Sequence, residues 1–188
     1  MVEKKKTLML AVKWSGSKRS QAKRILEFFP EEIGTYFEPF CGGCSVLVAL
    51  VADGRPVRRY VCSDANPDLI SLWTAVRDDP DGLWRHYSGL WEALRTAGFH
   101  DGSRALYEGV RDRFNGTRNP YDFLFVDRTC FNGLIRYNSK GEFNSPYHLN
   151  RGGIHPDKLH LTEVTVLGTK RREPVLTDAQ RSKGFSRD

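Results

Sequence analysis

The chain has 188 residues, of which 39% are hydrophobic and 28% are charged, and its formal net charge is +6. This length is enough for one domain with a real core, and no apolar stretch is long enough to span a membrane. Lys4-Lys5-Lys6 is followed by too short an apolar run for a signal peptide, so we expect a cytoplasmic protein. The positive charge favours a polyanionic partner, although many soluble proteins are mildly basic.

The four cysteines do not form a recognisable metal or disulfide pattern. Cys41 and Cys44 make one C-x-x-C pair, but no second pair exists and no histidine follows at zinc-finger spacing. We therefore expect no metal site, and a reducing compartment.

The first expected elements are a short strand over residues 8–12 and a helix that Pro30 ends. Ser17 is the expected cap of that helix, because a serine side chain can accept a hydrogen bond from the first turn. The apolar positions of the helix repeat at the spacing of a single face: Ala22, Ile25, Leu26 and Phe29.

An apolar run from Tyr36 to Phe40 then meets two glycines, Gly42 and Gly43, and a helical run from Ser45 to Val51. This order predicts a strand, a tight turn and a helix. Glycines at such a turn let backbone amides approach a ligand at the helix N-terminus. By itself the pattern also fits an ordinary turn of any α/β protein.

A second strand, Arg59 to Cys62, is followed by the acid Asp64, about twenty residues after the glycines. An acid at this spacing binds ribose hydroxyls in dinucleotide folds. Pro67 and Asp68 then suit the first turn of a helix. Two such units predict a nucleoside ligand; the alternative role of Asp64 is a helix cap.

Residues 80–128 are expected to be all-helical, with aromatic stripes that form core. The block interrupts the alternation of strands and helices, so it is predicted to be a helical insert. Trp73, before it, belongs to an apolar stripe that predicts core, and we expect His86 and His100 to be structural.

Residues 128–147 predict a β-hairpin with turns at Asn132-Gly133 and Lys140-Gly141. Basic, amide and aromatic side chains alternate there, as a nucleic-acid reader requires, although an ordinary polar hairpin fits as well. In the tail, residues 161–167 are a candidate strand, and the last eighteen residues are expected to be disordered.

Four ordered motifs resemble the Dam-type adenine-N6 DNA methyltransferases, over about residues 11–147. They are Lys13-Trp14-x-Gly16-x-Lys18; Phe37-Glu38-Pro39-Phe40-x-Gly42-Gly43; Asp64-x-Asn66-Pro67-Asp68-Leu69-Ile70; and the hairpin, from Arg128-Thr129-Cys130-Phe131-Asn132-Gly133 to Gly141-x-Phe143-Asn144-x-Pro146. Four motifs in family order are a specific match.

The resemblance implies S-adenosylmethionine as the cofactor and double-stranded DNA as the partner. The cofactor-binding positions that it implies are Trp14, Lys18, Phe40, Gly42 and Asp64. Its implied DNA contacts are Phe131, intercalating beside a flipped adenine; Asn132, on the orphaned base; Arg136, on a guanine; Leu134 and Pro146, as apolar base contacts; and Lys13. No catalytic residue is assigned.

Two departures from the family pattern stand out. Cys44 occupies a position where the family usually has a third small residue, so it is expected to crowd the cofactor loop slightly. The catalytic Asp-Pro-Pro-Tyr motif of the family has no counterpart after Tyr147. We expect a truncated methyltransferase, inactive alone; half of a split enzyme whose second polypeptide carries the motif, or a non-catalytic DNA-binding protein, remain alternatives.

The expected fold is therefore α/β: the first strands of a Rossmann-like methyltransferase sheet, with an inserted helical target-recognition domain that ends in a β-hairpin. Residues 1–79 would form the S-adenosylmethionine-binding part, residues 80–147 the DNA target-recognition domain, and residues 148–188 a return segment with a disordered polar tail.

Overall fold

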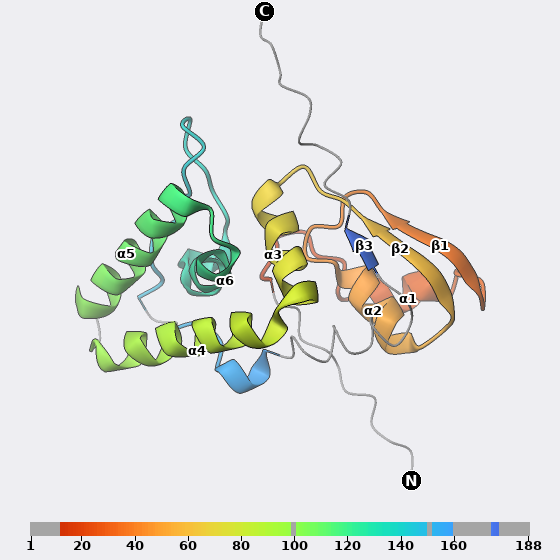
Figure 1. The fold of residues 1–188 in the computed structure, drawn as a ribbon, viewed down its shortest axis with the longest axis horizontal. Helices are drawn as coiled ribbons and strands as arrows, with labels where there is room; N and C mark the ends of the chain where they lie inside the picture. Colours follow the sequence, from red (N-terminus) through yellow and green to blue (C-terminus); the bar gives the residue numbers. More distant parts are fainter. Residues whose placement is uncertain (1–11, 99–100, 150–151, 160–173, 177–188) are drawn as a thin grey trace, which may run out of the picture.

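The computed structural model describes residues 12–98, 101–149, 152–159 and 174–176. A small parallel sheet lies on one side and a layer of helices on the other, with helix α3 between them (Figure 1). The mixed α/β architecture predicted from the sequence is confirmed.

The sheet has the strand order β1-β2-β3, and both pairings are parallel. Strand β1 spans Ile33–Glu38, β2 spans Val57–Cys62 and β3 spans Pro174–Leu176. Tyr36 pairs with Tyr60, and both rings are buried on the same face. Helices α1 (Ala22–Leu26) and α2 (Ser45–Asp53) pack against each other beside the sheet (Figure 1).

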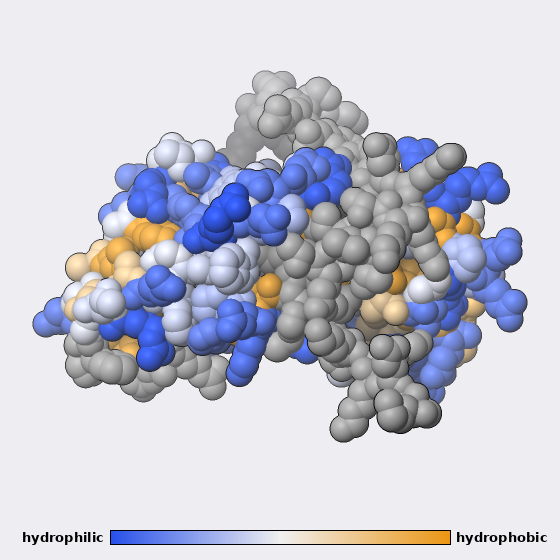
Figure 2. Space-filling model, turned by 60° about the horizontal axis from the view of Figure 1, so that its bottom comes forward, coloured by the Kyte–Doolittle hydropathy of each residue, from blue (hydrophilic) through white to orange (hydrophobic). Residues whose placement is uncertain are grey.

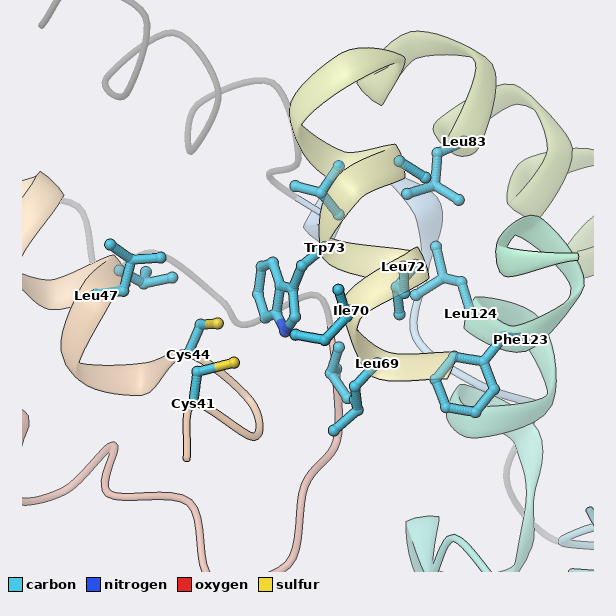
Figure 3. Close-up of a cluster of buried hydrophobic side chains, with 14 of the residues drawn as sticks. Cys41, Cys44, Leu47, Leu69, Ile70, Leu72, Trp73, Leu83, Phe123 and Leu124 are labelled. Atoms are coloured by element: carbon cyan, nitrogen blue, oxygen red, sulfur yellow. The ribbon is translucent and has the colours of Figure 1, made fainter. Parts of the chain in front are cut away.

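Helix α3 (Pro67–Asp78) joins the two halves of the molecule. Asn66 caps it, because its side-chain oxygen accepts the backbone N–H groups of Asp68 and Leu69. On one side of α3 Trp73 points toward the loop that carries Cys41 and Cys44, and on the other Leu72 faces Leu124 of helix α6 (Figure 3). The core is thus continuous across α3.

The expected all-helical block is confirmed. It consists of α4 (Pro80–Thr96), α5 (Asp101–Thr117) and α6 (Pro120–Thr129). Helix α6 contacts α3, α4 and α5, and its residues Phe123 to Val126 are completely buried. His86 of α4 is within 2.8 Å of the buried carboxylate of Asp122, which fits the structural role expected for it.

After α6 the chain forms an antiparallel loop, residues 130–147, which we call the 130–147 loop. It starts with a 3₁₀ turn at Phe131–Gly133, where Asn132 and Gly133 both have positive φ. Two isolated antiparallel bridges hold it together, Cys130 to Tyr147 and Tyr137 to Phe143. The 3₁₀ turn Pro156–Lys158 then returns to α4, where Trp84 Nε1 donates to the Pro156 carbonyl at 3.1 Å.

Two expectations from the sequence are wrong. Ser17 does not cap α1, whose N-cap residue is Gln21. The Ser17 hydroxyl instead lies 2.5 Å from the hydroxyl of Ser45, at the start of α2. Disorder throughout the last eighteen residues is contradicted at Pro174–Leu176, which pair with β2. Strand β3 was not foreseen because it has only three residues and begins with proline, which a strand tolerates at its first position.

The candidate strand at 161–167, residues 8–11 of the candidate strand 8–12, and His100 lie outside the described residues; Val12, which is described, is not in a strand. Within the described part of the chain, no helix has the length and apolar character that crossing a membrane requires. The face in Figure 2 is mainly hydrophilic, with separate hydrophobic patches.

Candidate cofactor and DNA sites

The glycine loop, residues 39–44, lies at the carboxyl ends of β1 and β2. Backbone hydrogen bonds continue past the strands: Ser63 N–H donates to the Glu38 carbonyl and Cys41 N–H to the Ser63 carbonyl, both at 3.0 Å. Ligands of open parallel sheets bind outside these strand ends. The loop is therefore held at the edge of the sheet where a ligand is expected.

Gly42 is fixed from three sides. Its N–H donates to Asp64 Oδ2 at 2.8 Å, and its carbonyl accepts the indole N–H of Trp73 at 2.9 Å. A β-carbon at Gly42 would lie 2.7 Å from Trp14 Nε1, and its φ is +48°. Only glycine satisfies both the conformation and the space available here.

Asp64 connects the glycine loop to the start of α3. Its second oxygen, Oδ1, accepts the N–H of Asn66 at 2.9 Å. Each carboxylate oxygen has two lone pairs, so Asp64 can still accept hydroxyl donors from a ligand. The alternative role as a cap of α3 belongs to Asn66 instead.

Only three of the five cofactor-binding residues predicted from the sequence lie together in the structure. Trp14 and Asp64 both lie against Gly42. Lys18 is exposed and donates from Nζ to the Gly16 carbonyl at 3.1 Å. Phe40, in the glycine loop itself, is 86% exposed.

A half-buried acid precedes the glycine loop and a buried thiol ends it. Glu38 accepts the Tyr36 hydroxyl at 2.9 Å and the Leu47 N–H at 3.1 Å, and burial raises its pKa. Cys44 adopts a left-handed conformation, with φ of 50°, and is completely buried. Burial also raises the pKa of Cys44, which keeps the thiol protonated and unreactive. Among the described residues no His, Cys, Asp or Glu cluster could hold a metal ion.

Five of the six sequence-predicted DNA contacts lie on the 130–147 loop. The loop brings Phe131 and Pro146 together, since Phe131 N–H donates to the Pro146 carbonyl at 2.8 Å. Asn132, Arg136 and Pro146 are exposed, and Leu134 is half-buried. Phe131 is 48% exposed and stacks on His148, with ring centroids 5.2 Å apart.

Lys13, the sixth, reaches this loop from the N-terminal motif. Its N–H donates to Asp127 Oδ2 at 2.9 Å, and its side chain lies against Gly133, where a β-carbon would be only 2.2 Å from Lys13 Cδ. Asp127 is completely buried, and burial raises its pKa to about 7. Lys13 and Trp14 thus connect the 130–147 loop to the glycine loop.

Sequence reasoning missed three residues that organise these sites: Trp73, Asp127 and Tyr137. Trp73 was correctly expected in the core, but its periodicity carried no sign of the bond to Gly42. Asp127 could have been found from the sequence, because it follows the apolar run of α6 and an acid in such a run is rarely buried without a role. Tyr137 was identified as one of the alternating aromatics of the hairpin, without its partner Asp68.

Comparisons with known proteins identify the family of the chain. The family model of the D12 class N6 adenine-specific DNA methyltransferases matches residues 14–159. The chain belongs to this family. The match covers the glycine loop, the helical layer and the 130–147 loop, so it supports the resemblance seen in the four motifs.

Individual relatives carry matching names. The chain is 36% identical to the Type II methyltransferase M.MjaIII of Methanocaldococcus jannaschii, over 83% of this chain and 57% of that protein. It is 34% identical to the DNA adenine methylase of Haemophilus influenzae, over 78% and 49% of the two chains. For the DNA adenine methylase of Vibrio cholerae the identity is 28%, over 94% and 59%. The chain therefore spans about half the length of these relatives.

Proposed function

We propose that this chain is the part of a DNA adenine-N6 methyltransferase that binds S-adenosylmethionine and reads DNA. The single observation that carries the proposal is the 2.8 Å bond from Gly42 N–H to Asp64, which unites the two cofactor motifs at one edge of the sheet. Family membership, over residues 14–159, supports the same function.

The cofactor would bind at the glycine loop, with its ribose hydroxyls on Asp64. The Trp14 indole fills the space that a side chain at Gly42 would take, so glycine at this position lets Trp14 pack against the loop. Phe40 of the glycine loop and Lys18 of the N-terminal motif are both exposed, so they can reach a bound nucleoside. S-adenosylmethionine supplies an electrophilic methyl group when bound; the residues named here bind and orient it.

DNA would be read by the 130–147 loop and Lys13, which together form the target-recognition part. Arg136 is exposed, and its guanidinium can donate two hydrogen bonds to O6 and N7 of a guanine. Phe131 presents a half-exposed ring as a wedge beside an extruded adenine, with Asn132 next to it for the orphaned base. Leu134 and Pro146 supply apolar contacts.

Methyl transfer also requires residues that position the adenine amino group. In the family the Asp-Pro-Pro-Tyr motif does this, and these 188 residues contain no such run. We propose that a protein of these 188 residues alone does not methylate adenine, because the acceptor would not be positioned. A second polypeptide with the motif and a non-catalytic DNA-binding role remain the alternatives.

Calorimetric titration with S-adenosylmethionine tests the cofactor site. Asp64→Ala should weaken binding by about 1–3 kcal/mol, because partner groups lose a charged acceptor. Asp78→Asn is the control: that acid lies at the far end of α3 and pairs with its neighbour Arg77. Equal affinity of the wild type and Asp64→Ala would exclude the proposed role of Asp64.

Labelled methyl transfer into duplex DNA tests the acceptor argument. No incorporation is expected with the 188-residue protein alone. Methyl incorporation that increases with the concentration of this protein, and disappears in Asp64→Ala, would show that the residues that position the adenine lie within this chain.

A further inference from the structure

A buried carboxylate on α3 connects the cofactor side of the molecule to the 130–147 loop. Asp68 is 7% exposed and lies in the first turn of α3. Its Oδ2 accepts the hydroxyl of Tyr137 at 2.6 Å and Nη1 of Arg118 at 3.3 Å. Tyr137 belongs to the 130–147 loop, 69 residues away along the chain.

Arg118 makes this contact a three-way junction. Its Nη2 donates to the Gly141 carbonyl at 2.5 Å, near the tip of the loop, and its guanidinium lies over the ring of Phe114 in α5. Tyr137 also packs edge-on against Phe143, its antiparallel partner across the loop. One carboxylate is therefore bonded to Tyr137 directly and connected to Gly141, near the tip of the loop, through Arg118.

The same carboxylate is close to the proposed cofactor contact. Asp64 accepts the N–H of Asn66, and the Asn66 side chain accepts the N–H of Asp68. Two hydrogen bonds thus separate the acid that would take the ribose hydroxyls from the residue that anchors the loop. Burial and the bond to Asp68 raise the pKa of Tyr137, so its hydroxyl remains a donor at neutral pH.

We propose that Asp68 is a positioning residue that anchors the DNA-reading loop to the cofactor-binding segment, so that cofactor bound at Asp64 steadies the loop through Asn66, Asp68 and Tyr137. The anchoring concerns the free protein. The transmission from cofactor to loop rests on the function proposed above.

Hydrogen exchange of the full chain, with and without S-adenosylmethionine, tests both parts. In the free protein Tyr137→Phe and Asp68→Asn should speed exchange of residues 134–145 by about tenfold, the effect of losing one charge-assisted hydrogen bond. Tyr121→Phe is the matched control, because Tyr121 makes an equally short bond of 2.6 Å to Asp79, away from the loop. It should leave residues 134–145 unchanged.

Adding the cofactor separates the two claims. In the wild type it should slow exchange at residues 39–44 and also at residues 134–145. In Tyr137→Phe the protection at residues 39–44 should persist while that at residues 134–145 is lost.

The outcomes are distinct. Equal loop exchange in Tyr137→Phe and Tyr121→Phe would overturn the anchoring. Protection of residues 134–145 that survives in Tyr137→Phe would overturn the transmission. If the cofactor protects neither segment of the wild type, the proposed function and the transmission fall together, while the tenfold difference in the free protein still supports the anchoring.

Discussion

The indole N–H of Trp73 donates to the carbonyl oxygen of Gly42, 2.9 Å away, and is completely enclosed by the core. Helix α3 therefore fixes the glycine loop from behind, while Asp64 fixes it from the side. The shape of the proposed cofactor site depends on this contact, although Trp73 itself is only 4% exposed.

Trp73→Phe should keep most of the apolar packing but leave the Gly42 carbonyl without its donor. An unpaired buried carbonyl costs about 1–2 kcal/mol, so the glycine loop of the free variant should shift to avoid this cost. Because cofactor binding must then restore the original loop shape, we expect cofactor affinity to fall roughly five- to thirtyfold in calorimetry. Trp84→Phe removes a similar indole-to-carbonyl bond, to Pro156, and should leave cofactor affinity unchanged. Equal affinity in the two variants would contradict the role of Trp73.

Gly42→Ala should abolish measurable cofactor binding and lower stability. The new β-carbon would meet Trp14 at 2.7 Å, in addition to a left-handed backbone that costs a non-glycine residue about 1–2 kcal/mol. Gly141→Ala carries the same backbone cost at φ of +75°, but its β-carbon enters open space. Urea unfolding should therefore show a larger loss for Gly42→Ala, and a similar loss in both would mean that Trp14 moves aside.

Asp127 should make stability decrease as the pH rises. Its pKa is about 7 in the folded protein, mainly because of burial, and about 3.9 in the unfolded chain. Between these values the folded state binds more protons than the unfolded one, so this contribution is full below about pH 4 and is lost through about pH 7. Asp127→Asn should remove the dependence.

Urea unfolding at several pH values between 5 and 8 measures this effect. Relative to Asp127→Asn, the wild type should lose on the order of 1–4 kcal/mol across that range. The introduced amide oxygen can still accept the Lys13 N–H, so the variant should fold. Parallel curves for the two proteins would show that Asp127 is charged throughout.

Arg136→Ala should flatten the preference for a cognate guanine, worth roughly 1–3 kcal/mol, while leaving non-specific DNA binding nearly intact. Lys140→Ala, at the exposed Lys-Gly turn, should instead weaken all sequences alike and lower the salt slope by about one unit. Fluorescence anisotropy over a salt series distinguishes the two. An equal loss on every sequence in Arg136→Ala would reassign Arg136 to the phosphate backbone.

The sequence predicted most helices and strands correctly, because each depends on residues that are close together in the chain. Strand, glycine turn and helix follow one another within residues 33–53, and Asn66-Pro67 marks the start of α3 as expected. Helix-spaced apolar residues likewise predicted α4 to α6. The prediction that Ser17 caps a helix was wrong because its hydroxyl makes a tertiary contact instead, and the sequence does not show that Ser45 lies nearby.

Long-range pairings were beyond this kind of reasoning. The bonds from Tyr137 to Asp68 and from Lys13 to Asp127 join residues 69 and 114 positions apart. Neither has a spacing rule, since each depends on how α3 and α6 pack. Likewise β3 carries too few residues to reveal a period, and only pairing with β2 makes it a strand.

The place of β3 also has a consequence for how the chain reaches its native state. Tyr60 and Pro174 are neighbours in the sheet but more than a hundred residues apart in the chain, with the whole helical layer between them. Closing so long a loop is entropically costly before any contact rewards it, and non-local pairing slows folding. We therefore expect α4 to α6 to collapse first on local contacts, and the docking of β3 beside β2 to be the late, slow step that completes the sheet.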